Sequence, residues 1–206
     1  MDLSDMTPRL IVGISGASGA AYGIRILQVL RDTPVETHLI VSKAGRLTLA
    51  QETGLRTGDL EDLADVVHAN HDIGASIASG SFRTMGMVVA PCSVKTMSEI
   101  ASGVTSSLMA RAADVQLKER RRLVLGIRET PLHRNHLRTM AELSELGAVI
   151  APPVPAFYTH PATVQDVVDH SVGRMLDLFD IEVGLVERWP GVAASLDGRP
   201  GAGGRA

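Results

Sequence analysis

Short apolar runs alternate along the chain with longer segments in which apolar residues recur every three or four positions. The short runs are rich in β-branched residues and predict buried strands at residues 10–14, 35–41, 85–90, 123–127 and 148–150. The longer segments predict helices at about residues 20–30, 43–53, 96–117, 131–146 and 163–179, with Pro131 in the first turn of the fourth. Strands that are apolar on both faces and alternate with helices form covered parallel sheets. We therefore expect a single-domain, three-layer, Rossmann- or flavodoxin-like doubly wound parallel sheet.

The predicted domain covers residues 9–190. Residues 1–8 are expected to form a flexible N-terminus, and the Gly- and Ala-rich residues 191–206 a disordered tail. A Gly-, Ser- and Ala-rich stretch at residues 73–86 predicts an ordered loop near the site or a mobile lid. Because ligands of doubly wound sheets bind beyond the carboxyl ends of the strands, the candidate site residues are those that follow strands.

Small residues follow the first predicted strand and open directly into a helix. Gly16, Ala17 and Ser18 let backbone amides approach an anion at the helix N-terminus. The glycine spacing is not G-x-G-x-x-G, and the second strand ends at Ser42, where a typical NAD site offers Asp or Glu. The pattern thus favours an anion site over an NAD site. The alternative, that the glycines only permit tight strand–helix packing, stays open.

A second candidate phosphate cradle follows the third predicted strand. Two hydroxyls and a lysine stand there at a predicted helix N-terminus, in the run Ser93, Val94, Lys95 and Thr96. The run is no Walker A loop, because the preceding glycines are missing. Cys92 just before it could be a nucleophile, but no base is assigned to it, which favours a buried structural thiol.

Arg128 and Glu129 follow the next predicted strand. An adjacent arginine and glutamate at the end of a strand can bind an anion and move a proton. The alternative is that Glu129 or Thr130 caps the helix that Pro131 begins. From the local sequence the two interpretations carry equal weight.

Composition and charge narrow the possible functions. A chain of 206 residues can bury a core without disulfide or metal staples. Aromatic residues make up 3% and the net charge is −3, so neither base stacking nor a basic surface favours nucleic-acid binding. With one cysteine, no signal peptide and no apolar run long enough for a membrane span, we expect a protein of the reducing cytoplasm. The His68/His71 and His133/His136 pairs lack a third ligand nearby, so no metal site is expected.

Seven short motifs occur in order along nearly the whole predicted domain. They are Gly16–Ala20, Ser42–Ala44, Pro91–Thr96, Arg111–Val115, Leu117–Arg121, Arg128–Leu132 and Pro155–Tyr158. Together they resemble the flavin prenyltransferases of the UbiX type, formerly described as aromatic-acid decarboxylases. The resemblance implies an FMN-binding, metal-independent subunit that assembles into a homododecamer. It also implies transfer of a dimethylallyl group from dimethylallyl monophosphate to N5 and C6 of reduced FMN, which makes prenylated FMN for UbiD-type decarboxylases of ubiquinone biosynthesis or aromatic-acid breakdown.

The resemblance also implies roles for individual residues. FMN would be contacted by Gly16, Ala17, Ser18, Ser42, Ser93, Val94, Lys95, Thr96 and Arg128. The prenyl phosphate would be bound by Tyr158, Arg174, Lys118 and Arg111, some of them from neighbouring subunits. Glu129 with Ser18 would assist the protonation steps, and Glu52 and Trp189 also match active-site positions.

Two other functions are alternatives. One is a flavin-dependent cysteine decarboxylase, which shares the fold but resembles this chain less at Pro91–Thr96 and at Arg128 and Glu129. The other is a non-enzymatic flavin carrier subunit of a decarboxylase. Because a carrier needs no second phosphate site, Lys118, Tyr158 and Arg174 favour the prenyltransferase.

Overall fold

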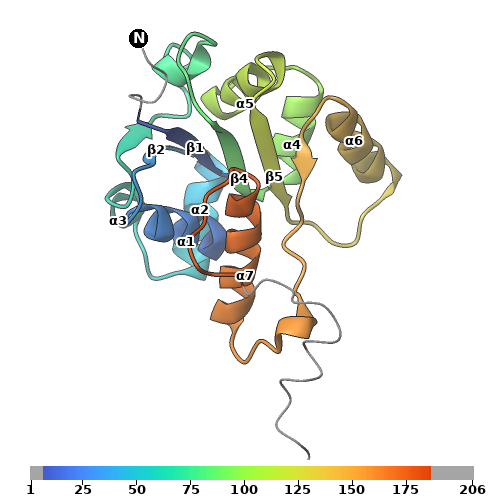
Figure 1. The fold of residues 1–206 in the computed structure, drawn as a ribbon. Helices are drawn as coiled ribbons and strands as arrows, with labels where there is room; N and C mark the ends of the chain where they lie inside the picture. Colours follow the sequence, from blue (N-terminus) through green and yellow to red (C-terminus); the bar gives the residue numbers. More distant parts are fainter. Residues whose placement is uncertain (1–6, 187–206) are drawn as a thin grey trace, which may run out of the picture.

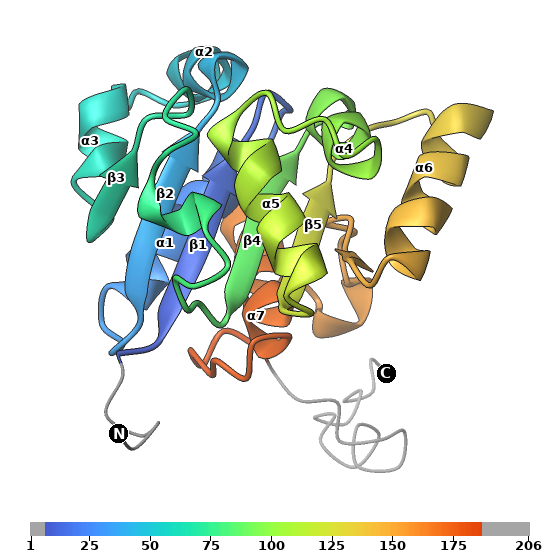
Figure 2. The same ribbon diagram turned by 90° about the horizontal axis from the view of Figure 1, so that it is seen from above.

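A single parallel sheet of six strands forms the centre of the molecule, in the order β3-β2-β1-β4-β5-β6. The computed structural model describes residues 7–186. The strands are β1 (Arg9–Ile14), β2 (Glu36–Val41), β3 (Val66–His68), β4 (Gly86–Cys92), β5 (Arg122–Ile127) and β6 (Val149–Ile150). Figure 1 and Figure 2 show helices on both faces of this sheet. The expected three-layer, doubly wound parallel fold is confirmed.

Helices cover the two faces of the sheet in separate groups. They are α1 (Ala20–Leu30), α2 (Lys43–Glu52), α3 (Thr57–Glu61), α4 (Val94–Ala101), α5 (Leu108–Lys118), α6 (Arg134–Glu145) and α7 (Val164–Asp177), with short 3-10 turns η2 (Ser76–Ala78) and η3 (Phe157–Thr159). In Figure 2, α4 and α5 lie on one face and α1 and α7 on the other.

Each face of the sheet has its own aliphatic core. Along β1, Leu10 and Val12 belong to the core under α1 and α7, whereas Ile11 belongs to the core under α4 and α5. This alternation follows from the two-residue period of a strand, because successive side chains point to opposite faces. All three side chains are fully buried, which is why the strand reads as a continuous apolar run in the sequence.

The structure differs from the predicted elements in several places. The sequence pattern does not reveal β3, because its three residues are only partly covered at the edge of the sheet. The predicted helix over residues 96–117 is two helices: α4 ends at Ala101, and Ser107 caps α5. The helix after β5 begins at Arg134 with His133 as its N-cap, so Pro131 does not occupy its first turn.

The stretch at residues 73–86 is an ordered loop. The Ile77 side chain is 1% exposed, and the Arg121 guanidinium donates hydrogen bonds to the carbonyl oxygens of Phe82 (2.8 Å) and Gly80 (2.6 Å). None of the residues of this stretch lines the cavity described below. Of the two expectations for it, the structure favours the ordered loop, but away from the site.

Several sequence-based expectations concern residues outside the described ones. Residues 1–6 of the expected flexible N-terminus, the expected disordered tail at residues 191–206, and Trp189 all lie outside residues 7–186. Within residues 7–186, no helix is long and apolar enough to cross a membrane.

Candidate active site

Successive strands are added to one side of β1 up to β3 and to its other side from β4 onward. This reversal places a crevice between the loops that follow β1 and β4. Ser15, directly after β1, joins the two loops. Its hydroxyl donates to the carbonyl oxygen of Pro91 (2.9 Å) and accepts from the backbone amide of Ser93 (2.7 Å). Ser15 is fully buried, so both hydrogen bonds are shielded from water. The two loops are therefore held in one relative position.

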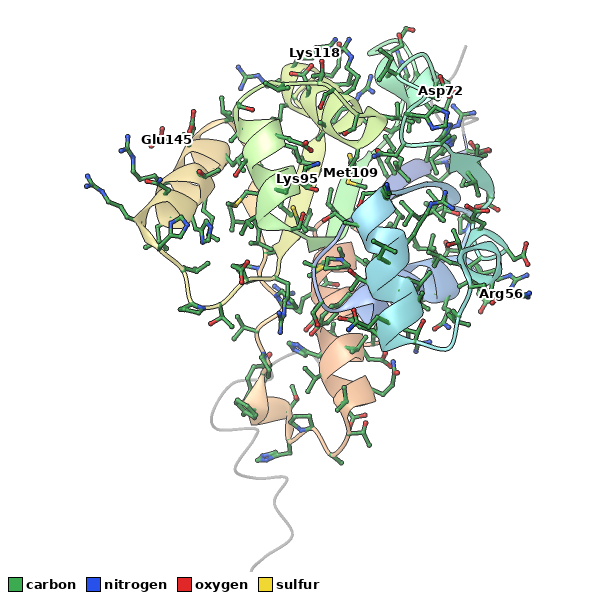
Figure 3. The ribbon with its side chains drawn as sticks, turned by 180° about the vertical axis from the view of Figure 1, so that it is seen from behind. Arg56, Asp72, Lys95, Met109, Lys118 and Glu145 are labelled. Atoms are coloured by element: carbon green, nitrogen blue, oxygen red, sulfur yellow. The ribbon has the colours of Figure 1, made fainter. Side chains whose placement is uncertain are left out.

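A cavity of about 360 Å³ lies at the carboxyl edge of the sheet. Its lining comes from the starts of three helices and from loops after the strands: Gly16, Ser42, Lys43, Ala44, Leu47, Asn70, Ser93, Lys95, Thr96, Glu99, Ser107 and Met109. Figure 3 shows Lys95 and Met109 beside each other at this edge. Five of the residues predicted to contact FMN line the cavity, namely Gly16, Ser42, Ser93, Lys95 and Thr96. Ala17, Ser18, Val94 and Arg128 do not line it.

Three helices begin at the cavity, each with a serine as its N-cap. The Ser42 hydroxyl accepts from the Gly45 amide (3.0 Å), Ser93 from the Thr96 amide (3.3 Å) and Ser107 from the Ala110 amide (3.3 Å). The free backbone amides at a helix N-terminus carry partial positive charge. The cavity therefore offers backbone donors and hydroxyls to an anion, together with the Lys95 ammonium group, which in this structure pairs with Glu99 at 3.0 Å.

The lack of a side chain at Gly16 allows the loop after β1 to lie against the start of α2. A Cβ atom added there would be 2.3 Å from the Cβ atom of Ala44 and 3.1 Å from its carbonyl carbon. Real Cβ atoms do not approach so closely, so a side chain at Gly16 would push the loop away from α2. The glycine at position 16 is thus a packing requirement of the cavity wall.

Glu52, the last residue of α2, lies against the start of α1. One of its carboxylate oxygens accepts from the amides of Gly19 (2.8 Å) and Ala20 (3.0 Å). Burial raises the pKa of Glu52, but hydrogen bonds from Ser18 and the two amides, with the charge of Arg128, bring the pKa below its ordinary value. Two predicted site residues, Ser18 and Arg128, therefore act on the ionised carboxylate of a third, Glu52.

Arg128 and Glu129 stand in the turn after β5. The Arg128 amide donates to the Cys92 carbonyl (3.1 Å), which ties this turn to the end of β4. Glu129 accepts from the amide of its neighbour Thr130 (2.9 Å), while His133 caps α6 through the Asn135 amide (3.2 Å). The alternative that Glu129 or Thr130 caps this helix is wrong, because the helix begins later than predicted.

The thiol of Cys92 is fully buried at the end of β4. Burial raises its pKa to about 12, so it stays protonated at neutral pH. This confirms the interpretation of Cys92 as a buried structural thiol and excludes an activated nucleophile at this position.

The four residues predicted to bind the prenyl phosphate do not form one cluster in this chain. Tyr158 lies in η3 and Arg174 in the last turn of α7, where Arg174 pairs with Asp177 at 2.7 Å. Arg111 pairs with Asp114 at 2.9 Å, and Lys118 pairs with Glu119. Lys118 ends α5, about 15 Å along the helix from the residues at the cavity. Figure 3 shows it far from Lys95 and Met109.

The cavity also contains residues that the sequence analysis does not single out. The side chain of Asn70 accepts from the Met109 amide (3.1 Å), and its carbonyl oxygen accepts from the Leu108 amide (2.8 Å). Asn70 therefore joins the loop after β3 to the start of α5. The position of Asn70, a polar residue two positions after a strand, could have identified it as a site residue. The sequence pattern does not predict that strand, β3, so the signal was not available.

The two His-x-x-His pairs do not form metal sites with other ligands. The His133 and His136 rings stack with centroids 3.5 Å apart, and His68 contacts His38 at 2.9 Å. Among residues 7–186, no group of three or more His, Cys, Asp or Glu side chains is arranged to hold a metal ion.

Comparison with known proteins identifies the family. Residues 2–187 match the family model described as Flavoprotein. Over 186 residues the chain is 58% identical to "Flavin prenyltransferase UbiX" of Escherichia coli (strain K12), which covers 89% of this chain and 98% of that protein. The chain belongs to the UbiX-type flavin prenyltransferases. Its membership makes it a transferase, and the cysteine decarboxylase and carrier alternatives are not favoured.

Solved structures of UbiX-type proteins share this fold. The crystal structure of AnUbiX (PadA1) in complex with FMN and dimethylallyl pyrophosphate has a TM-score of 0.89 and 51% identity, over 91% of this chain and 100% of that one. A dodecameric FMN-dependent UbiX-like decarboxylase from Escherichia coli O157:H7 has a TM-score of 0.87 and 50% identity, over 89% and 100%. The resemblance stated from the sequence motifs is confirmed.

The cavity fits the flavin mononucleotide that this UbiX-type family binds. A nucleotide phosphate needs amide, hydroxyl and cationic donors, which the three helix starts and Lys95 supply. A flavin ring needs apolar surface, which Met109 and Leu47 contribute to the same wall. The donor set and the apolar contacts thus match both ends of FMN.

Proposed function

We propose that this chain transfers a dimethylallyl group from dimethylallyl monophosphate to N5 and C6 of reduced FMN, making prenylated FMN. The observation that carries this proposal is the anion-binding cavity between the loops after β1, β2 and β4, in a chain 58% identical to a flavin prenyltransferase. In the proposed site, reduced FMN supplies the ring atoms that accept the prenyl group. The chain binds both substrates, stabilises the departing phosphate and moves protons.

FMN binding is proposed for the residues of the cavity wall and its border. They are Gly16, Ala17, Ser18, Ser42, Ser93, Val94, Lys95, Thr96 and Arg128. The support is local geometry: Ser42 and Ser93 hold the starts of α2 and α4 in place, and the Ser42 hydroxyl, which accepts from Gly45, keeps its own hydrogen for a ligand. Arg128 contributes a guanidinium at the neighbouring turn.

Release of the prenyl phosphate is proposed to depend on cationic side chains. Breaking the allylic C–O bond leaves negative charge on the phosphate and positive charge on the prenyl group. Arg174, Lys118 and Arg111 would stabilise the phosphate, each exchanging a neighbouring carboxylate for it. Tyr158, or Trp189 outside the described residues, offers an aromatic face to the allylic cation.

Proton movement is proposed for Ser18 and the two glutamates, Glu52 and Glu129. The lowered pKa of Glu52 keeps its carboxylate ionised at neutral pH, so it accepts a proton rather than donating one. A hydrogen bond joins its side chain to Ser18. When the Ser18 hydroxyl donates to Glu52, it can pass its own proton to that carboxylate while its oxygen takes a proton from a substrate. Glu129 would act from the turn after β5.

We propose that the subunits assemble into a homododecamer, as the related protein from Escherichia coli O157:H7 does. Three apolar side chains near η3 support an assembly, because they are largely exposed in the single chain: Val154 (71%), Phe157 (76%) and Val164 (82%). In such an assembly Lys118 and Arg111 of one subunit would complete the phosphate site of a neighbour. Light scattering of the purified protein tests this, with a mass of about one subunit contradicting it.

The product is proposed to pass to a UbiD-type decarboxylase in the cytoplasm.

Anaerobic incubation of the protein with reduced FMN and dimethylallyl monophosphate tests the reaction itself. We expect mass spectrometry to find FMN heavier by one C5 prenyl group, with one inorganic phosphate released per flavin modified. Parallel samples lack one substrate or contain dimethylallyl diphosphate, which measures the preference between the two phosphates. Unmodified FMN in the complete reaction contradicts the proposal.

A further inference from the structure

His170 of α7 lies against Tyr158 of η3, although neither the motifs nor the cavity lining includes this histidine. The histidine Nε2 atom is 3.3 Å from the tyrosine hydroxyl oxygen. The two rings meet edge to face, with centroids 5.9 Å apart and an interplanar angle of 87°. The His170 side chain thus contacts both the ring and the hydroxyl group of Tyr158.

The same face of α7 carries His170 and Arg174. Residues four positions apart on a helix are neighbours on its surface, at about 6 Å between Cβ atoms. Asp169, the residue before His170, is held by a two-pronged ion pair with Arg25 of α1 (2.8 and 3.1 Å). This ion pair fixes α7 against α1, so the histidine stands on a rigid helix that also carries the arginine.

The direction of the contact between His170 and Tyr158 decides what the phenol can do. A phenol has one hydrogen to donate. If the histidine Nε2 atom accepts that hydrogen, none is left for a phosphate. If Nε2 carries a hydrogen and donates it to the phenol oxygen, the phenol can donate its own hydrogen to a phosphate oxygen. A phosphate bound beside Arg174 favours the second arrangement, because it accepts hydrogen bonds strongly.

We propose that His170 is a positioning residue for the phosphate end of the prenyl substrate: it donates to the Tyr158 hydroxyl and directs the phenol hydrogen toward the phosphate. The inference rests on the proposed function, which places Tyr158 and Arg174 at that phosphate. His170 itself touches neither the flavin nor the phosphate. Its effect is therefore on the binding of dimethylallyl monophosphate, through Tyr158.

Two variants separate the hydrogen bond from the packing. His170→Phe keeps an aromatic ring against Tyr158 and removes the nitrogen, whereas His170→Gln removes the ring and keeps an amide donor. On FMN-loaded protein we expect His170→Phe to raise the KM for dimethylallyl monophosphate roughly three- to tenfold, the effect of one neutral hydrogen bond, with kcat nearly unchanged. We expect His170→Gln to restore most of the loss. Calorimetric titration with dimethylallyl monophosphate gives the same ranking without turnover.

A double-mutant cycle tests whether His170 acts through Tyr158. We expect His170→Phe to have no further effect on substrate binding when combined with Tyr158→Phe. The inference is overturned if His170→Phe has equal effects in the wild-type and Tyr158→Phe backgrounds. It is also overturned if the KM is unchanged in the single variant His170→Phe. So does a loss of FMN binding or a lowered melting temperature in His170→Phe, since either indicates a structural role.

The outcomes distinguish this inference from the proposed function. If wild-type protein makes prenylated FMN and Tyr158→Phe binds the prenyl phosphate normally, the inference is wrong and the reaction stands. If wild-type protein makes no prenylated FMN and does not bind dimethylallyl monophosphate in the titration, the proposed function fails and the inference fails with it.

Discussion

The backbone amide of Ser93 donates a 2.7 Å hydrogen bond to the hydroxyl of Ser15, across the crevice between β1 and β4. The same hydroxyl donates to the Pro91 carbonyl at 2.9 Å. One buried side chain therefore satisfies an acceptor at the end of β4 and a donor in the residue that follows the strand. This bridge therefore sets the distance between two walls of the cavity, one containing Gly16 and the other containing Ser93.

Replacing this bridge tests its importance. In Ser15→Ala the buried Ser93 amide loses its acceptor, which costs about 1–3 kcal/mol of folding free energy and loosens both loops. We expect FMN to bind at least several-fold more weakly, measured by flavin fluorescence. Ser98→Ala on α4 is the control, because that hydroxyl is exposed and only contacts the carbonyl of Val94 in the same helix. Equal FMN affinity in the two variants contradicts a role for the bridge.

A methyl group at Gly16 is predicted to disturb the cavity more than one at another loop glycine. Gly16→Ala places a Cβ atom 2.3 Å from that of Ala44, so the loop must move away from α2. We expect FMN affinity to fall at least tenfold, as binding sites depend on sub-ångström positions. A Cβ atom at Gly54 meets nothing within 4 Å, so Gly54→Ala is the matched control. Flavin retained after gel filtration of both variants measures the difference.

The charge of Glu52 is predicted to matter more than its shape. Gln at this position keeps an oxygen for the Gly19 and Ala20 amides but loses the ionised carboxylate beside Ser18 and Arg128. We expect Glu52→Gln to lower turnover about tenfold or more while its melting temperature stays within a few degrees of wild type. Glu142→Gln on the exposed surface of α6 is the control for the charge change. Full activity in Glu52→Gln removes Glu52 from the proton pathway.

The central strands and the loops that carry the cavity are readable from the sequence, because each central strand contains a buried apolar run. Ser42 and Ser93 follow such runs directly, and helical periodicity begins after each. The short edge strand β3 offers no such run, so Asn70 behind it is not found. The helix start predicted at Pro131 is wrong for a local reason. Proline suits the first turn of a helix, but this helix begins only after its N-cap residue, His133.

The remaining site features depend on contacts between distant segments. Ser15 and Ser93 are 78 positions apart, and Glu52 reaches the start of α1 from 33 positions away. Periodicity within a window of residues carries no information on such pairs. The family resemblance marks Glu52 as an active-site position without explaining it, whereas the hydrogen bonds that Glu52 accepts from Gly19 and Ala20 do explain it. His170 has no motif at all, and only its contact with Tyr158 brings it to notice.

A partly buried chain of hydrogen-bonded side chains on β2 and β3 predicts how stability depends on pH. His38 contacts the Glu36 carboxylate through Nε2 (2.8 Å) and His68 through Nδ1 (2.9 Å). Because the carboxylate accepts, His38 must donate from Nε2, so its Nδ1 accepts from His68 when both rings are neutral. Hydrogen bonds from His38 and Arg9 lower the pKa of Glu36. Burial, and then the neighbouring His38, lower the pKa of His68.

The lowered pKa values of Glu36 and His68 change the stability in the same direction. A folded-state pKa below the unfolded value means that acid favours the unfolded chain, so stability is lost as the pH falls. The loss begins near the ordinary histidine value of 6.5 and continues below the ordinary glutamate value of 4.5. We expect His68→Gln, which keeps a donor for His38 but does not titrate, to lose less unfolding free energy between pH 7 and pH 5 than wild type. Urea unfolding at one protein concentration measures this, with exposed His71→Gln as the control. Equal losses in both variants contradict the prediction.

Glu129 and His133 stand four residues apart in the turn after β5, and the structure assigns the helix cap to His133 alone. Glu129→Gln keeps an oxygen for the Thr130 amide, so folding and FMN binding are expected to remain while turnover falls about tenfold or more from the lost carboxylate. His133→Ala is expected to do the opposite: it lowers stability by about 1 kcal/mol and leaves turnover nearly unchanged. Thermal unfolding, flavin content and the anaerobic prenylation rate are measured on both. If Glu129→Gln loses flavin or fails to assemble, its role is structural, because a charge used only for proton transfer is not needed to hold FMN.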